Sequence, residues 1–175
     1  MRAIQWLALA TVASGCTSSS SDDTQYYFDA SCGEACADRF VGSATLGTLI
    51  FLWNQNLAGQ PTGAQNKMVN CAFGGTVHIT GTTGYDNGTQ IATAHIVYDL
   101  AACHHQDTSF SMTFTGMIAE DGTFSPNATS LAYTTDPLVA SGTAGSYQVG
   151  ATCALNMTRS KTSVSGQWCG RPFSY

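Results

Sequence analysis

The chain has 175 residues, of which 43% are hydrophobic and only 10% are charged, and its formal net charge is −5 at pH 7. The length suits a single domain. The basic residues are not clustered, which argues against binding to nucleic acid or to anionic lipid through charge. Abundant glycine and threonine with few charges are typical of short β-strands joined by tight turns.

The amino terminus has the organisation of an export signal. A positively charged start and a short apolar segment are followed by small residues, in the order of a secretory signal peptide. The sequence Ala13-Ser14-Gly15-Cys16 resembles the lipobox of bacterial lipoproteins, although that family usually has leucine in the place of Ala13. The resemblance implies a signal peptide over residues 1–15 and a lipid on Cys16. An ordinary secretory peptide, with Cys16 as a spare thiol, is the alternative.

Residues 16–30 are expected to be a tether, because the run of Ser, Thr and Asp from Thr17 to Thr24 cannot bury apolar surface. In the lipoprotein family an Asp directly after the lipidated cysteine can retain the protein in the inner membrane. Thr17 in that place implies lipid anchoring in the outer membrane, periplasmic or surface-facing, if the cell has two membranes. The aromatic triplet Tyr26-Tyr27-Phe28 favours packing onto the domain over a patch that binds a partner.

The longest apolar segment of the mature chain runs from Arg39 to Leu57 and predicts a buried helix. Ser31, followed three residues later by Glu34, is a reciprocal N-cap arrangement that starts the helix near Cys32. The apolar residues recur at three- and four-residue spacing and extend around the cylinder: Leu46, Leu49, Ile50, Phe51, Leu52, Trp53 and Leu57.

Two further features of this segment bear on its packing. Gly42 and Gly47 weaken a helix by about 1 kcal/mol each but allow another backbone to approach closely. The apolar run is interrupted and falls short of the roughly 20 residues that a bilayer requires, so a core helix is favoured over a membrane span.

After this helix the chain alternates apolar and polar residues in short segments, which predicts β-strands. We expect strands over residues 74–81, 91–100, 110–118, 131–134, 138–142, 147–157 and 164–169. Turns are expected at Asp86-Asn87-Gly88 and at Glu120-Asp121-Gly122. The pattern favours an antiparallel meander of about six strands, and the helix before it makes residues 31–175 a single α+β domain.

The chain has seven cysteines, and setting aside the lipidated one leaves an even number, which suits disulfides in an oxidising compartment. Cys153 and Cys169 lie symmetrically about the last polar turn, and Cys71 and Cys103 are similarly placed about an earlier turn. We favour the pair Cys153–Cys169 and leave the pairing of Cys71 and Cys103 open. The implied registers set Leu155 opposite Gln167 and Ile79 opposite His95, and a bulge at Gly166 would repair the first.

The remaining Cys32 and Cys36 are one helical turn apart, where a bond between them is geometrically awkward. An alternative scheme therefore ties them separately to Cys71 and Cys103, which would join the helix to the sheet.

The segments Cys71–Thr82 and Ser163–Tyr175 resemble a group of uncharacterised bacterial lipoproteins that share such cysteine-flanked strands. The likeness covers most of residues 71–175 and implies no activity.

The densest set of metal-ligand residues is His104, His105 and Asp107, which could hold Zn²⁺ or Cu²⁺. Adjacent strand residues point to opposite faces, so these side chains converge only in a loop. A solvated loop is the favoured interpretation, and a surface or hydrogen-bonded role is favoured for His95. Nucleophile, P-loop, zinc-protease and dinucleotide motifs do not occur in the sequence, so we expect neither enzymatic activity nor a cofactor.

Three functions fit this sequence. The first, which we favour, is a membrane-anchored envelope lipoprotein with a structural or protein-contact role. The second is a binding module for an apolar ligand in a sheet–helix cleft, with Trp53 or Trp168 near its mouth, and a dry cavity above about 300 Å³ would favour it. The third is a metal-binding protein at His104, His105 and Asp107.

Overall fold

The structure, a computed structural model, describes residues 33–135 and 137–175. The expected signal peptide, Cys16, the tether, Ser31 and Cys32 lie outside the described residues. The described part consists of one helix followed by ten strands: α1 (Glu34–Asn56), β1 (Gly63–Asn70), β2 (Thr76–Asp86), β3 (Ile91–Gln106), β4 (Phe110–Phe124), β5 (Thr129–Thr135), β6 (Leu138–Ala144), β7 (Tyr147–Cys153), β8 (Leu155–Ser160), β9 (Val164–Trp168) and β10 (Arg171–Ser174).

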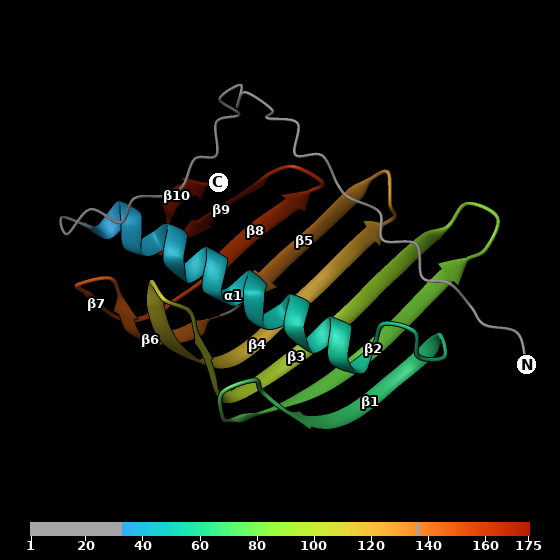
Figure 1. The fold of residues 1–175 in the computed structure, drawn as a ribbon, viewed down its shortest axis with the longest axis horizontal. Helices are drawn as coiled ribbons and strands as arrows, with labels where there is room; N and C mark the ends of the chain where they lie inside the picture. The colour runs from blue at the N-terminus through green and yellow to red at the C-terminus, as the bar shows by residue number, and fades with distance from the viewer. Residues whose placement is uncertain (1–32, 136) are drawn as a thin grey trace, which may run out of the picture.

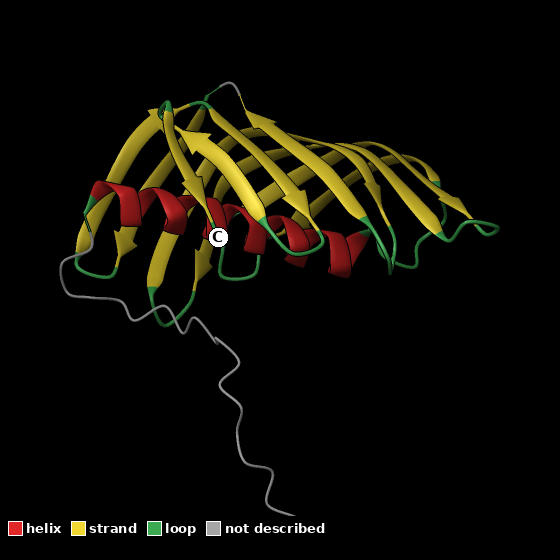
Figure 2. Cartoon of the chain, turned by 90° about the horizontal axis from the view of Figure 1, so that it is seen from above, coloured by secondary structure: helices red, strands yellow, loops and turns green. Residues whose placement is uncertain are grey.

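The strands form one antiparallel sheet that curves around the helix. Its order is β1-β2-β3-β4-β5-β8-β9-β10, and β6 and β7 extend from a second pairing between β4 and β6. The helix α1 crosses one face of this sheet (Figure 1), and the sheet arches over it (Figure 2). The fold is therefore α+β as expected, but the described residues contain ten strands where the sequence analysis expected about six.

The helix begins later than predicted. Its N-cap is Gly33, which makes no side-chain capping hydrogen bond, whereas the expected cap at Ser31 lies outside the described residues. At the other end, the Lys67 ammonium on β1 donates a 2.7 Å hydrogen bond to the carbonyl of Asn56. A cation at this position suits the unsatisfied carbonyls and partial negative charge of a helix C-terminus.

The burial of α1 agrees with a core helix. By length and composition the helix could cross a membrane, yet 61% of its most apolar window is buried within the structure. The expected apolar residues contribute to this surface, with Leu49 and Leu52 almost fully buried and Trp53 partly buried. Burial of this kind is the main source of stability for such a helix.

The two glycines of α1 face aromatic rings of the sheet rather than backbone, which corrects the expectation. A Cβ at Gly42 would lie 2.5 Å from the Phe173 ring, and a Cβ at Gly47 would lie 2.8 Å from Nε2 of His105. Both glycines thus make room for side chains of the sheet at the helix surface.

The strand β4 passes straight through the predicted turn at Glu120-Asp121-Gly122. Gly122 has φ 140°, a conformation that favours glycine, and it remains paired with Ala94 on one side and Leu131 on the other. The strand therefore continues through Gly122, and Glu120 stays within the sheet.

Two disulfides are present: the favoured pair Cys153–Cys169, and Cys71–Cys103, which the sequence analysis left open. Cys36 is disulfide-bonded as well. The alternative scheme, which ties Cys71 and Cys103 to the helix, is therefore wrong.

The registers differ from those that the cysteine positions implied. Leu155 faces Trp168 rather than Gln167, so two apolar residues are paired. The adjustment lies at Cys169, whose φ is 53°, and not at a bulge on Gly166. Ile79 likewise faces Tyr98 rather than His95, because Cys71 precedes β2 and the disulfide therefore does not set the register of β2 against β3.

Candidate functional site

The chemically most distinctive group in the described structure is the carboxyl of Glu120, which is only 4% exposed although it belongs to a sheet. It lies on the face of β4 that is turned toward α1, in step with Phe110, Met112 and Phe114. The hydroxyl of Tyr98 on β3 donates to Oε2 at 2.6 Å, and the hydroxyl of Tyr133 on β5 donates to Oε1 at 3.3 Å. Both carboxyl oxygens thus have a partner, as a buried charge requires.

Burial controls the protonation of this cluster. Desolvation raises the pKa of Glu120, against the opposing effects of the two tyrosine hydrogen bonds and of the Arg159 charge. Desolvation, together with the neighbouring carboxyl, also raises the pKa of Tyr98 and Tyr133. Both tyrosines are therefore protonated donors at neutral pH, and folding shifts the titration of the Glu120 carboxyl to higher pH.

A hollow of about 220 Å³ lies beside this cluster, between α1 and strands β4, β5 and β8. It is lined by aliphatic and aromatic side chains and by a few polar ones: Leu49, Ile50, Trp53, Asn54, Glu120, Phe124, Thr129, Leu131, Tyr133 and Arg159. The rings of Trp53 and Phe124 meet edge to face, with centroids 4.9 Å apart, and form one wall of this inner hollow.

A second, outer hollow of about 420 Å³ lies on the other side of the same two rings. Its walls come from the end of α1 and from strands β2 and β3, and are largely apolar: Leu57, Ala58, Gly59, Gln60, Thr62, Thr83, Gly84, Tyr85 and Ala92. Tyr85 is 52% exposed at this site. We refer to the inner and outer hollows, joined through Trp53 and Phe124, as the helix–sheet cleft.

The sequence analysis named Trp53 and Trp168 as candidates for the mouth of a cleft, and only Trp53 lies at the helix–sheet cleft. Trp53 lines both hollows of the cleft. Trp168 is 1% exposed and lies in the core opposite Leu155. Its place at a cleft mouth is therefore wrong, since the one-residue change in register turned it inward.

The predicted metal residues do not converge. His104 and His105 lie on β3, not in a loop, and so point to opposite faces. His104 hydrogen-bonds to the hydroxyls of Thr113 and Ser111, each at 3.2 Å. His105 stacks on Phe110 with ring centroids 5.6 Å apart, and burial lowers its pKa.

Asp107 instead accepts hydrogen bonds from the Thr108 hydroxyl and the Ser109 amide. Across residues 33–135 and 137–175, no three His, Cys, Asp or Glu side chains are grouped so as to hold a metal ion. The structure therefore does not bring together the three residues of the alternative metal site, and the favoured solvated loop is replaced by strand β3 for His104 and His105.

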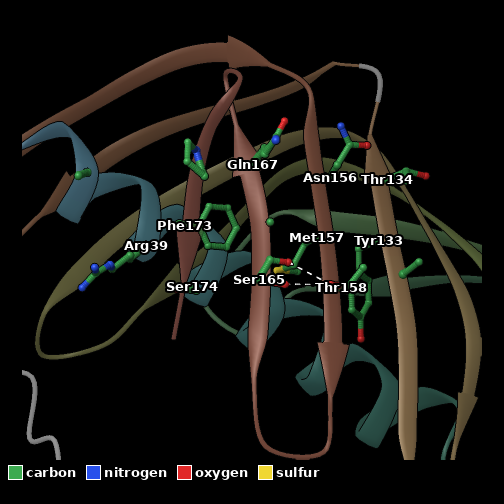
Figure 3. A pocket seen from close by; sticks show the side chains of 14 residues that line it. Arg39, Tyr133, Thr134, Asn156, Met157, Thr158, Ser165, Gln167, Phe173 and Ser174 are labelled. Carbon is green, nitrogen blue, oxygen red and sulfur yellow. Dashed lines mark hydrogen bonds between the residues drawn. The ribbon is translucent and has the colours of Figure 1, made fainter.

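The outer face of the sheet carries two further polar features. His95 Nδ1 lies 2.7 Å from the Asp121 carboxylate, and both side chains are more than 60% exposed, which agrees with the expected hydrogen-bonded surface role. An open groove of about 810 Å³ crosses β5, β8, β9 and β10. Figure 3 shows Thr134, Asn156 and Gln167 side by side along it, as their strand registers require.

This groove is less suited to a specific small ligand than the cleft. Thr134, Asn156 and Gln167 are all exposed, and Thr158 and Ser165 beside them bond to each other at 3.1 Å. Enclosure by apolar walls with a few converging polar groups is the usual arrangement of a ligand site, and the helix–sheet cleft has it.

Sequence reasoning missed Glu120, although a signal for it was present. The alternation of Phe110, Met112 and Phe114 continues in steps of two to residue 120, and a carboxylate on an apolar face marks a functional candidate.

No protein-family model, curated protein or solved structure matches this chain.

Proposed function

We propose that the domain binds a small, largely apolar molecule in the helix–sheet cleft. The observation that carries this proposal is the outer hollow of about 420 Å³, which adjoins the inner hollow at Trp53 and Phe124. Its volume lies within the usual range of ligand pockets, about 300–1,000 Å³. An apolar ligand there would move from water onto the apolar surfaces of Trp53, Phe124 and Ala92. This transfer would contribute roughly 25 cal/mol of binding free energy for each Å² buried.

Binding of N-phenyl-1-naphthylamine, a neutral apolar probe that fluoresces out of water, tests the proposal. We expect saturable binding to the wild-type domain. Ala92→Phe should weaken it about tenfold or more, because the new ring fills the outer hollow. Ala119→Phe is the matched control, since Ala119 lies on β4 outside the cleft lining, and it should leave binding unchanged. Failure of the wild type to bind, or equal binding by Ala92→Phe, would reject the cleft as a site.

We further propose that this domain is carried on the outside of a membrane by a lipid on Cys16. The two disulfides support an oxidising, exported compartment. Mass spectrometry of material from the native host should find acylation at Cys16, and a chain that starts at Met1 would contradict this. The structural or protein-contact role stays a prediction from the sequence.

A further inference from the structure

We propose that the ligand of the helix–sheet cleft is an amphiphile with an anionic head, a carboxylate above all, and that Arg159 binds this head. The inference rests on the proposed function, because it names the class of molecule that the same cleft would take.

The guanidinium of Arg159 interacts with the Tyr133 hydroxyl and with the charge of Glu120, but within the described residues it is not ion-paired, and its remaining N–H donors can serve a ligand. Arg159 lies on β8 and lines the inner hollow together with Tyr133 and Glu120. The ion pairs within the described residues involve Arg171 and His95, so Arg159 has no carboxylate within 4 Å there. An arginine presents five N–H donors in a planar fork that matches a carboxylate in two parallel hydrogen bonds. A cation at the inner end of an apolar cleft therefore complements an anionic head.

The neighbouring carboxyl of Glu120 does not form an ion pair with Arg159. Both oxygens of Glu120 already accept hydrogen bonds from Tyr98 and Tyr133. Burial raises the pKa of Glu120, so the charged carboxylate is less favoured in the folded domain than in the unfolded chain. Among the residues that line the inner hollow, Arg159 is thus the one that carries a positive charge.

The apolar walls of the cleft extend from Arg159 toward the outer hollow, and the alkyl tail of the ligand would lie along them. Ile50 and Trp53 from the helix and Phe124 from the sheet separate Arg159 from the outer hollow. A head at Arg159 would direct an alkyl chain along the Trp53 and Phe124 rings toward Ala92. The chemistry that fits is a medium-chain fatty acid or another single-chain carboxylate.

Three single-chain probes of equal length test the inference: decanoate, decyltrimethylammonium and 1-decanol, each below the concentration at which it forms micelles. Binding is followed by calorimetry and by Trp53 fluorescence, with Trp53→Phe identifying the tryptophan that reports. We expect decanoate to bind about tenfold or more tightly than decyltrimethylammonium. Arg159→Met should remove that preference and weaken decanoate about tenfold, with little effect on 1-decanol.

Two further variants keep the test decisive. Lys161→Met removes one positive charge from the exposed turn after β8 and should leave decanoate binding unchanged, which separates a local contact from net charge. Glu120→Gln should bind decanoate at least as tightly as the wild type. If Arg159→Met fails to fold, as judged by circular dichroism, Arg159→Gln takes its place.

The outcomes separate the inference from the function on which it rests. Equal binding of decanoate by Arg159→Met and the wild type would overturn the anionic head and leave apolar binding intact. A preference for decyltrimethylammonium that Glu120→Gln abolishes would assign recognition to the carboxyl instead. If none of the three probes binds, the cleft is not a ligand site and the proposed function fails with it.

Discussion

Glu120 is the residue whose environment departs most from what its chemistry prefers. A carboxyl that is 4% exposed loses its hydration, and two tyrosine hydroxyls replace only part of it. The folded state therefore binds the proton more tightly than the unfolded chain does. The stability that this proton contributes is fully present below the unfolded pKa, about 4.3, and is lost as the pH rises through the folded pKa.

This linkage gives a pH-dependent prediction. Between about pH 4 and pH 8 the free energy of unfolding of the wild type should fall relative to that of Glu120→Gln, which cannot ionise. At the acid end the two proteins should agree within about 1 kcal/mol, since glutamine keeps a neutral hydrogen-bonding group. Urea unfolding across this range measures the difference, and parallel profiles would show that Glu120 titrates alike in both states.

Gly42 offers a second test at a single position. Glycine to alanine inside a helix ordinarily gains about 1 kcal/mol, but here the new Cβ would meet the Phe173 ring at 2.5 Å. Overpacking typically costs about 1–3 kcal/mol, so we expect Gly42→Ala to lower stability by about 1 kcal/mol.

The neighbouring Ser43→Ala is the control, because Ser43 is only half-buried, and it should change stability by less than about 0.5 kcal/mol. In a double-mutant cycle, Phe173→Leu should relieve part of the Gly42→Ala loss. Strict additivity would mean that the ring is not the obstacle.

The sequence predicted single residues unevenly, for physical reasons. The expected strand over residues 91–100 lies within β3, and because side-chain direction in a strand has a fixed period of two, Tyr98 falls among its buried residues. Glu120 was missed because three turn-forming residues in succession outweighed that period. Glu120 meets Tyr98 and Tyr133 because β3 and β5 are the neighbours of β4 in the sheet. The local sequence pattern does not say which strands will be neighbours.

At the scale of elements, the attachment of β10 to α1 stands out. The Arg171 guanidinium binds Asp38 through two hydrogen bonds, Nε to Oδ2 at 2.7 Å and one terminal nitrogen to Oδ1 at 2.8 Å. The Asp38 side chain is 2% exposed and that of Arg171 is 44% exposed. The pair thus joins the first element of the domain to its last.

Arg171→Met should destabilise the domain by about 2 kcal/mol. Removing one partner of a buried pair costs about 3–5 kcal/mol, and we reduce this figure because the arginine side chain is partly in water. Asp38→Asn in the same chain should recover part of the loss, since the remaining buried group is then neutral. Chemical unfolding of the three proteins tests this, and an additive loss in the double variant would contradict it.

Alternation predicted where strands lie better than where they begin and end. The segment from Tyr147 to Met157 has strict alternation, yet it divides at Ala154 because β7 and β8 pair with different partners, β6 and β5. The polar β1 and the four-residue β10 carry too few apolar residues to give a pattern. Only their pairing with neighbours makes them strands.

The whole molecule is held by crosslinks as well as by its core. Cys153 and Cys169 are 16 residues apart in sequence, and Cys71 and Cys103 are 32 apart. From loop-closure entropy in the unfolded chain, replacing the first pair by serine should cost about 3 kcal/mol and the second about 4 kcal/mol. Urea unfolding of the two paired variants tests the order, and wild-type stability in either would contradict it.

The α+β class of the fold could be predicted from the sequence, whereas the order in which the strands pair could not. One long apolar helix ahead of alternating segments predicts a helix on an antiparallel sheet. The reason is that the apolar side of the helix and the apolar face of the sheet are buried against each other. The second pairing of β4, with β5 along one half and β6 along the other, depends on long-range choices. Such choices also decide where the cleft opens.

The contact between Asp38 and Arg171 spans 133 positions of the chain, and this has a consequence for biosynthesis. The apolar helix is synthesised before the ten described strands, and β10, which secures its beginning, follows the other nine. Until translation passes residue 171, the nascent chain should expose apolar surface of the helix. Chaperones at the ribosome or in the export pathway would have to shield that surface. A chain interrupted just before that point should aggregate or be degraded rather than accumulate.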